Sequence, residues 1–223
     1  MIFYDMLGDE SRARSKYIAE HYADRNSVLA VLPMLRGNEN AALVEQVLAK
    51  LEAKNPDYAP LKKYKADMAE AKAQKERLAE GKVAPEFSFP TPDGKKKLGP
   101  QDFKGKILVL DFWASWCRPC RASFPEMKKL YAEYHKKGVE ILGITNDSRK
   151  TDWLKALEED NLPWLQVIDE YPIRNTPAKV ATLYAIPYLP TLMLIDPDGK
   201  IVGKAKDKHE LKTWLDERLA NKK

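Results

Sequence analysis

Two cysteines lie three residues apart, Cys117 and Cys120, and the sequence of 223 residues contains no others. With no second pair available, they do not form a framework of structural disulfides, so we expect them to carry chemistry. A thiolate can attack a disulfide, and a second cysteine almost one helical turn further on can then attack the mixed disulfide and release the product. The spacing therefore predicts thiol-disulfide exchange, with Cys117 attacking and Cys120 resolving.

Half of a zinc site is the main alternative for such a pair. Zinc would require two further ligands at a recurring spacing, whereas His21, His135 and His209 are scattered singly along the chain. The redox interpretation is therefore favoured. It implies no metal and no organic cofactor, because the two cysteines carry the redox equivalents themselves.

The cysteines follow residues 107–113, an apolar run rich in β-forming side chains that predicts a central strand. We therefore expect the pair at a strand end and at the opening of a helix. There, amide donors and the helix dipole lower a thiol pKa from about 8.5 toward 7 or below. Arg118 adds positive charge, which favours the thiolate and makes the disulfide more oxidising, and Pro119 stiffens the segment between the cysteines.

The sequence divides at about residue 80 into two regions of different character. Residues 1–80 show helical spacing of apolar side chains, and the segment from about 58 to 80 predicts a long charged helix. One helical face, which we expect to be buried, carries Tyr17, Ile18, His21 and Tyr22. We predict a helical region over residues 1–80 with no catalytic cluster.

Residues 81–223 change to short strands and turns that alternate with helices. This order predicts an α/β fold in which a mixed sheet is flanked by helices. The expected elements are strands at 87–89, 107–113, 139–144 and 164–168, helices at 124–134, 152–159 and around 211–219, and a hairpin of 191–195 with 201–204 across a turn at 196–200.

A resemblance to the thioredoxin family rests on ten consecutive residues, Asp111-Phe112-Trp113-Ala114-Ser115-Trp116-Cys117-Arg118-Pro119-Cys120. Arg118 departs from it, since typical thioredoxins have glycine there. Residues 83–223 are similar to the TlpA/ResA-type branch, exported bacterial thiol-disulfide oxidoreductases of AhpC/TSA-like thioredoxin fold with an amino-terminal hairpin. The resemblance implies a thioredoxin-like domain over residues 81–223 and disulfide exchange with protein substrates, as a reductant.

The same resemblance assigns roles to individual residues. It implies that Asp111 is a buried acid that takes a proton from Cys120, and that Pro125 kinks the active-site helix. It also implies a cis peptide bond at Pro190, beside which the backbone of Leu189 pairs with an extended substrate. The expected substrate-binding residues are Trp116, Arg118, Pro119, Leu189 and Pro190. The lysine that partners the buried acid in many thioredoxins falls near Gly143 here.

Charge and hydropathy limit the partners. The net charge of +5 is spread among both signs, so nucleic-acid binding is disfavoured, and no apolar run approaches the roughly 20 residues needed to span a membrane.

The first residues do not form a signal peptide. The helical region resembles the linker of larger exported thioredoxin-like proteins, which implies a longer natural chain and a periplasmic or otherwise extracytoplasmic location. The expected partners are disulfide- or dithiol-containing proteins and a redox partner that recycles the cysteines.

Two other functions remain open. A peroxiredoxin shares the fold, but its P-x-x-x-T/S-x-x-C pattern would require proline at Leu110 and threonine or serine at Ala114. A binding module without exchange activity is the second alternative. The presence of both cysteines, Asp111 and Pro190 argues against it.

Overall fold

The computed structural model describes residues 2–35, 37–169 and 178–220, with side chains from residue 9 onward. The chain forms two compact units, Met1–Ala73 and Gln74–Lys223. The predicted domain boundary after residue 80 remains a prediction.

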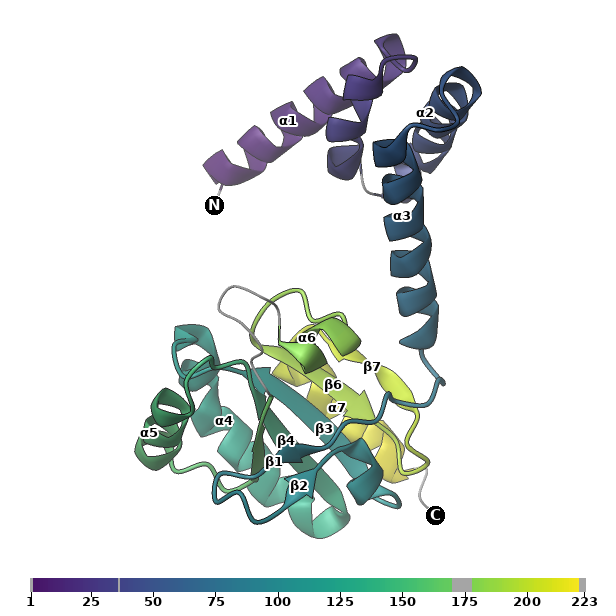
Figure 1. Ribbon diagram of the computed structural model, residues 1–223. Helices are drawn as coiled ribbons and strands as arrows, with labels where there is room; N and C mark the ends of the chain where they lie inside the picture. The colour runs from purple at the N-terminus through teal and green to yellow at the C-terminus, as the bar shows by residue number, and fades with distance from the viewer. Residues whose placement is uncertain (1, 36, 170–177, 221–223) are drawn as a thin grey trace. The chain divides into compact units, whose positions relative to one another are not determined.

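The first unit is helical throughout the part that the structure describes (Figure 1). Its elements are α1 (Ile2–His21), η1 (Asn26–Ala30), η2 (Leu32–Leu35), η3 (Asn38–Asn40), α2 (Ala41–Lys54) and α3 (Ala59–Arg77), the last of which runs on into the second unit. Apolar side chains from these elements form one core, which includes Ala19, Val28, Leu32, Leu35, Val47, Leu51 and Leu61.

The prediction of which face of α1 is buried was wrong. Tyr17 is 55% exposed and Tyr22 is 37% exposed. The small side chains Ser15, Ala19 and Ala23 are buried instead. Small residues let the helix approach its neighbours closely, and a pattern based on large apolar residues does not register that preference.

The second unit contains a mixed five-stranded sheet in the order β5-β4-β3-β6-β7. β3 pairs in parallel with β4 and antiparallel with β6, while β4–β5 is parallel and β6–β7 antiparallel. The strands are β3 (Ile107–Trp113), β4 (Val139–Thr145), β5 (Leu165–Ile168), β6 (Thr191–Ile195) and β7 (Ile201–Ala205). A separate two-stranded hairpin precedes them, formed by β1 (Phe89–Pro90) and β2 (Lys97–Leu98).

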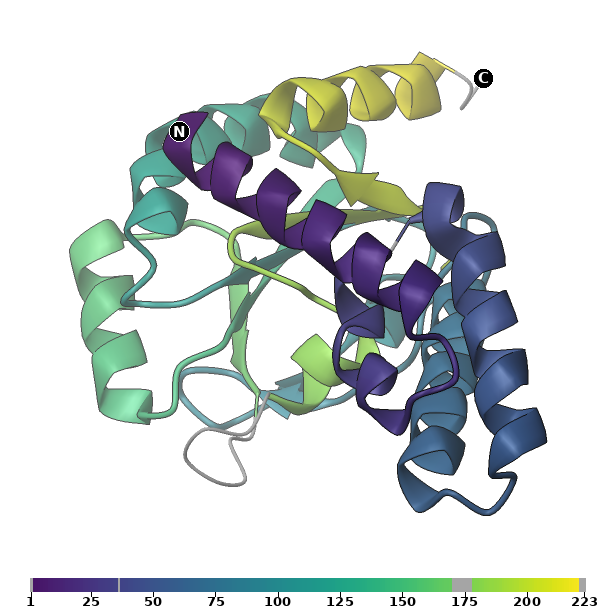
Figure 2. The ribbon, with the colours of Figure 1, turned by 90° about the horizontal axis from the view of Figure 1, so that it is seen from above.

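Helices cover one face of the sheet, and the hairpin with a short helix covers the other (Figures 1 and 2). The first face packs against α4 (Arg118–Tyr134), α5 (Lys150–Asp160) and α7 (Lys208–Ala220). The opposite face packs against the β1–β2 hairpin, η4 (Pro100–Phe103) and α6 (Lys179–Leu183). A single turn, η5 (His135–Lys137), links α4 to β4. This is the predicted α/β architecture, with the first unit's helices preceding it in the chain.

Two expected elements differ markedly from the structure, and one further helix was not expected. The helix expected at 124–134 begins at Arg118, six residues earlier, because its first turn carries polar and small residues without apolar periodicity. The strand expected at 87–89 is limited to Phe89–Pro90. The five-residue helix α6 was not predicted, since it is too short to show a helical period.

Candidate functional site

The reactive pair lies where β3 ends and α4 begins. Cys117 is the N-cap of α4, and its Sγ accepts a hydrogen bond from the backbone N–H of Cys120 at 3.3 Å. Pro119 occupies the first turn, where it removes no hydrogen bond that the helix needs. An N-cap sulfur faces the unpaired amides and the positive end of the helix dipole, so this position stabilises a thiolate at Cys117.

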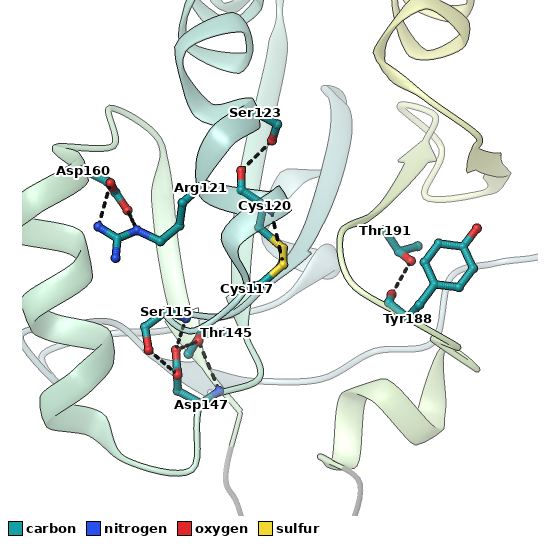
Figure 3. Close-up of a disulfide and its surroundings, with 10 residues drawn as sticks. All are labelled: Ser115, Cys117, Cys120, Arg121, Ser123, Thr145, Asp147, Asp160, Tyr188 and Thr191. Atoms are coloured by element: carbon teal, nitrogen blue, oxygen red, sulfur yellow. Dashed lines mark hydrogen bonds and ion pairs between the residues drawn. A yellow bond between two sulfur atoms is a disulfide. The ribbon is translucent and has the colours of Figure 1, made fainter. Parts of the chain in front are cut away.

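The two cysteines form a disulfide with their Cα atoms 5.3 Å apart. Cys117 is 4% exposed and Cys120 is 1% exposed, and both belong to the core between the sheet and α4. Ser123 donates from Oγ to the carbonyl oxygen of Cys120 at 2.6 Å (Figure 3). Only the edge of the pair reaches the surface, at Cys117, which is the geometry expected when the first cysteine attacks and the second resolves.

Exposed side chains surround that edge. Trp116 is 66% exposed although it is a large apolar ring, and Arg118 and Pro119 are exposed on the first turn of α4. Large apolar side chains gain from being covered, so an exposed tryptophan beside a redox pair offers contact area for a partner. The structure therefore brings together the three surface residues that the sequence placed next to the cysteines.

The loop before β6 forms the other side of the site. The Leu189–Pro190 peptide bond is cis, as the family resemblance implied. Leu189 is half-buried against the core that contains both cysteines, whereas Tyr188 is 68% exposed (Figure 3). Thr191 donates from Oγ1 to the carbonyl oxygen of Tyr188 at 2.7 Å and so ties the loop to the start of β6.

Asp111 is buried in β3 on the face of the sheet that α4 covers. Its neighbours on that face of the strand, Val109 and Trp113, belong to the same core as Cys120. Asp111 is 3% exposed, and burial raises the pKa of its carboxyl from an ordinary value of 3.8 to about 7. An acid with this pKa can exchange a proton near neutral pH, which is the property that a proton acceptor for Cys120 requires.

A second buried aspartate, Asp147, holds the loop that leads to Cys117, and the sequence analysis did not identify it. Its carboxylate accepts from the Ser115 backbone N–H at 2.8 Å, from Ser115 Oγ at 2.6 Å and from Thr145 Oγ1 at 2.5 Å (Figure 3). The backbone of Asn146 also donates to the carbonyl of Trp113 at 2.8 Å. The end of β4 therefore fixes the loop between β3 and α4. The sequence signal was an aspartate two residues after a buried parallel strand.

An ion pair holds α4 beside α5, and it too escaped the sequence analysis. Arg121 contacts Asp160 through two hydrogen bonds, of 2.7 Å from Nε and 3.0 Å from Nη2, and contacts Glu159 at 2.8 Å. The hydrogen bonds to Asp160 and Glu159 raise the pKa of this guanidinium further above its usual value. Residues 38 and 39 positions apart in the chain gave no pattern that could have predicted the contacts.

No helix within residues 2–35, 37–169 or 178–220 has the length and apolar character needed to cross a bilayer. Pro125, the proline that the resemblance places in the active-site helix, lies inside α4 and is exposed.

Comparison with known proteins agrees with this geometry. A family model described as the AhpC/TSA family matches residues 81–204. The chain is 37% identical over 132 residues to a protein of Bacillus cereus named thiol-disulfide oxidoreductase ResA, a match that covers 59% of this chain and 72% of the relative.

Solved structures are similar over the second unit. The thioredoxin domain of a thiol-disulfide oxidoreductase from Bacteroides vulgatus matches with a TM-score of 0.57 and 35% identity, covering 63% of this chain and 98% of that one. A thiol:disulfide interchange protein DsbE from Chlorobium tepidum matches with a TM-score of 0.57 and 30% identity, covering 64% and 99%. The mixed sheet with its flanking helices is therefore thioredoxin-like.

Proposed function

We propose that this chain, which belongs to the AhpC/TSA family, is a thiol-disulfide oxidoreductase that exchanges disulfides with protein substrates. The observation that carries the proposal is the Cys117–Cys120 disulfide at the start of α4, with Cys117 as N-cap beside the exposed ring of Trp116. Relatives named thiol-disulfide oxidoreductase support the same reaction.

The reaction proceeds in two steps. The Cys117 thiolate attacks one sulfur of a substrate disulfide, so that a mixed disulfide forms and the other substrate sulfur leaves as a thiolate. Asp111 then takes the proton of Cys120, whose thiolate attacks Cys117 Sγ. This second step closes the Cys117–Cys120 disulfide and releases the substrate as a dithiol. A partner dithiol protein must reduce the pair again before the next turnover.

Substrate recognition uses both sides of the site. Trp116, Arg118 and Pro119 contact the substrate from the start of α4, and Leu189 and Pro190 contact it from the loop before β6. An extended segment can pair with the backbone of Leu189 while its disulfide lies over Cys117. Backbone pairing and exposed apolar contacts suit many proteins with an accessible disulfide, because neither reads a particular side chain.

The surroundings of the pair favour the reducing direction. A disulfide carries no charge, whereas a thiolate is stabilised by water, so deep burial of both sulfurs disfavours the charged reduced form. Strong oxidants owe their potential to a stabilised reduced form. Two features oppose this effect. The N-cap position stabilises the Cys117 thiolate, and Arg118 adds positive charge, although its exposed side chain lies in water that screens this charge.

We also propose a periplasmic or otherwise extracytoplasmic location in a bacterium, which the resemblance to exported oxidoreductases supports. Proteins with disulfides are found mainly in oxidising compartments, and these proteins are the substrates of such an enzyme. The role there is to maintain the thiol-disulfide balance of other proteins.

Trapping the mixed disulfide tests the proposed reaction. We expect a Cys120→Ser variant, reduced and mixed with insulin, to accumulate a covalent adduct that dithiothreitol dissolves. A Cys117→Ser variant retains the other thiol and serves as the matched control, in which no adduct is expected. Equal adduct in both variants, or none in either, would contradict the assigned order of attack. Peroxide consumption by the reduced protein would instead support the peroxidase alternative, which Leu110 and Ala114 disfavour.

A further inference from the structure

Several buried polar atoms on the cysteine side of the sheet lack a hydrogen-bond partner among the described residues. They include the indole Nε1 atoms of Trp153 and Trp164, and also Oδ2 of Asp111 and Nε2 of Gln166, whose residues are 3% and 5% exposed. Leaving a buried polar atom without a partner costs about 1–3 kcal/mol, so native proteins rarely do so. The atoms of Asp111 and Gln166 therefore point to a partner that the described part of the chain does not supply.

The two residues belong to one row across the sheet. Asp111 on β3 is in register with Gly143 on β4, and Gly143 is in register with Gln166 on β5. Paired residues of adjacent strands present their side chains on the same face, here the face that α4 covers. Because Gly143 has no side chain, nothing of its own separates Asp111 from Gln166.

The amide of Gln166 fills the place that a side chain at position 143 would take. A Cβ atom on Gly143 would lie 2.2 Å from Gln166 Oε1 and 2.5 Å from Nε2. Trp113, on β3, donates from Nε1 to Gln166 Oε1 at 3.0 Å. An indole nitrogen can only donate, so it fixes the amide oxygen toward Trp113 and leaves Nε2 as a donor for another group.

A separation of one strand spacing suits one water molecule. Adjacent strands lie about 4.8 Å apart, so an amide above Gly143 stands about one strand spacing from the Asp111 side chain. Two hydrogen bonds of about 2.8 Å that meet at one water span such a gap. A buried water needs at least two polar partners, and Asp111 Oδ2 with Gln166 Nε2 supplies an acceptor and a donor.

We propose that Gln166 is a positioning residue for the exchange reaction, which holds a buried water molecule against the carboxylate of Asp111. The water accepts from Gln166 Nε2 and donates to Asp111 Oδ2, and so favours the charged acid that is ready to take the Cys120 proton. The inference rests on the proposed role of Asp111 in that step. Gln166 can hold this position because Gly143 offers no side chain that would fill it.

Neither a charged neighbour nor a register partner stabilises the charged form of Asp111. Burial is the cause of its raised pKa, with no charged neighbour contributing. Its register partners are Gly143 on β4 and Leu192 on β6, and neither titrates. The packed helices bring to this core the titratable Tyr131 and Tyr134 and the disulfide-bonded Cys117 and Cys120 from α4. They also bring Trp153 from α5, whose indole N–H lacks a partner among the described residues, and the apolar Leu211 and Leu215 from α7.

Infrared titration of the oxidised, full-length protein tests the inference. The carbonyl band of protonated Asp111 is isolated by subtracting an Asp111→Asn variant, and its midpoint is followed with pH. Gln166→Met keeps the side-chain volume but removes the amide donor. We expect its midpoint to rise by about one pKa unit, because a hydrogen bond to the charged form is lost.

Gln101→Met is the matched control. Gln101 also has a buried amide oxygen without a partner among the described residues, but it donates to the carbonyl of Phe87 in the core on the other face of the sheet. The titration midpoint of Asp111 in Gln101→Met should equal that in the wild type. An unchanged midpoint in folded Gln166→Met would overturn the proposal, because a role in packing alone does not alter the proton affinity of Asp111.

A crystal structure of the wild-type oxidised protein gives a test that needs no variant. Density for a water within hydrogen-bond distance of Asp111 Oδ2 and Gln166 Nε2 supports the proposal, and a dry gap overturns it. Neither measurement requires exchange activity. Failure of the insulin trapping experiment would therefore count against the proposed function alone, and an unshifted titration against Gln166 alone.

Discussion

The two units of the chain differ most in what they bury. Among the side chains described between residues 9 and 73, the buried polar groups are Ser15 and Asn40, and no carboxylate is buried. Among the described residues of the second unit, four acids are buried, namely Asp111, Glu140, Asp147 and Asp169. Both units contain well-buried apolar cores, so packing alone does not require this difference.

Burial of acids in the second unit marks where the chemistry lies. A buried carboxylate is costly unless donors surround it, as they do at Asp147, or unless it keeps its proton, as Asp111 does up to about pH 7. Asp147 holds the loop that leads to Cys117, and we propose that Asp111 serves proton transfer. The helical unit bears no such cost in its described residues, and we expect these residues to contribute to folding rather than to the reaction.

The largest expected effect comes from the sulfur that attacks. Cys117→Ser removes the nucleophile, so the rate of insulin reduction should fall by more than about a thousandfold. Thermal unfolding of the variant, measured under reducing conditions beside the reduced wild type, should remain cooperative. Residual exchange within tenfold of the wild type would mean that Cys120 can attack in its place.

The Asp111→Asn variant separates the loss of stability caused by a buried acid from the contribution of that acid to exchange. The pKa of Asp111 lies near 7 in the folded protein and near 4 in the unfolded chain, so between these values the folded state alone keeps the proton. The wild type therefore loses stability as pH rises from 4 to 7, whereas the variant does not.

The variant's gain in unfolding free energy should grow from near zero at pH 4 to about 3–4 kcal/mol at pH 8, as urea titrations at several pH values can measure. The resolution of a mixed disulfide should meanwhile slow by about a hundredfold at neutral pH. A variant whose stability advantage is the same at pH 4 and pH 8 would show that the acid is not buried in the folded state.

A core substitution in the helical unit should give the opposite result. Leu51 is fully buried, and Leu51→Ala should destabilise that unit by about 2–5 kcal/mol through the cavity it leaves. The rate of insulin reduction should be unchanged at temperatures where the variant is folded. A parallel loss of exchange would show that the helical unit contributes to the site, and the comparison between the units would fail.

The smallest expected effect concerns the loop that leads to Cys117. Asp147→Ala removes three hydrogen bonds that hold Ser115 and Thr145, so Cys117 loses its fixed position and exchange should slow by about tenfold. Asp196→Ala is the control, because Asp196 likewise holds a loop through its carboxylate. It accepts hydrogen bonds from two backbone N–H groups in the β6–β7 turn. If both variants slow exchange equally, the effect belongs to general destabilisation.

Local patterns predicted most of the sheet and the position of the cysteines. The strand at 107–113 and the hairpin around 196–200 were confirmed, because apolar runs and turn residues act within a few positions of each other. The order of elements predicted the α/β class, whereas the thioredoxin-like fold and the cis bond at Pro190 came only from the family resemblance.

The remaining features of the site depend on contacts across the sheet. Asp147 reaches Ser115 over 32 positions, and Gln166 reaches Trp113 over 53. Neither contact leaves a periodic signal, because register between strands is set by the folded sheet. In the sequence, Gly143 stood out only because the lysine of many thioredoxins is absent there. The structure adds that the amide of Gln166 occupies the space that a side chain at position 143 would take.

The midpoint potential of the Cys117/Cys120 couple tests the central claim most directly. The protein is equilibrated in defined dithiol and glutathione buffers, and the reduced fraction is counted by thiol alkylation. We predict a reversible two-electron couple at or below about −230 mV, the range of reductants. A value of about −180 to −120 mV would contradict the reducing direction, and a pair that fails to exchange with either buffer would contradict the oxidoreductase function itself.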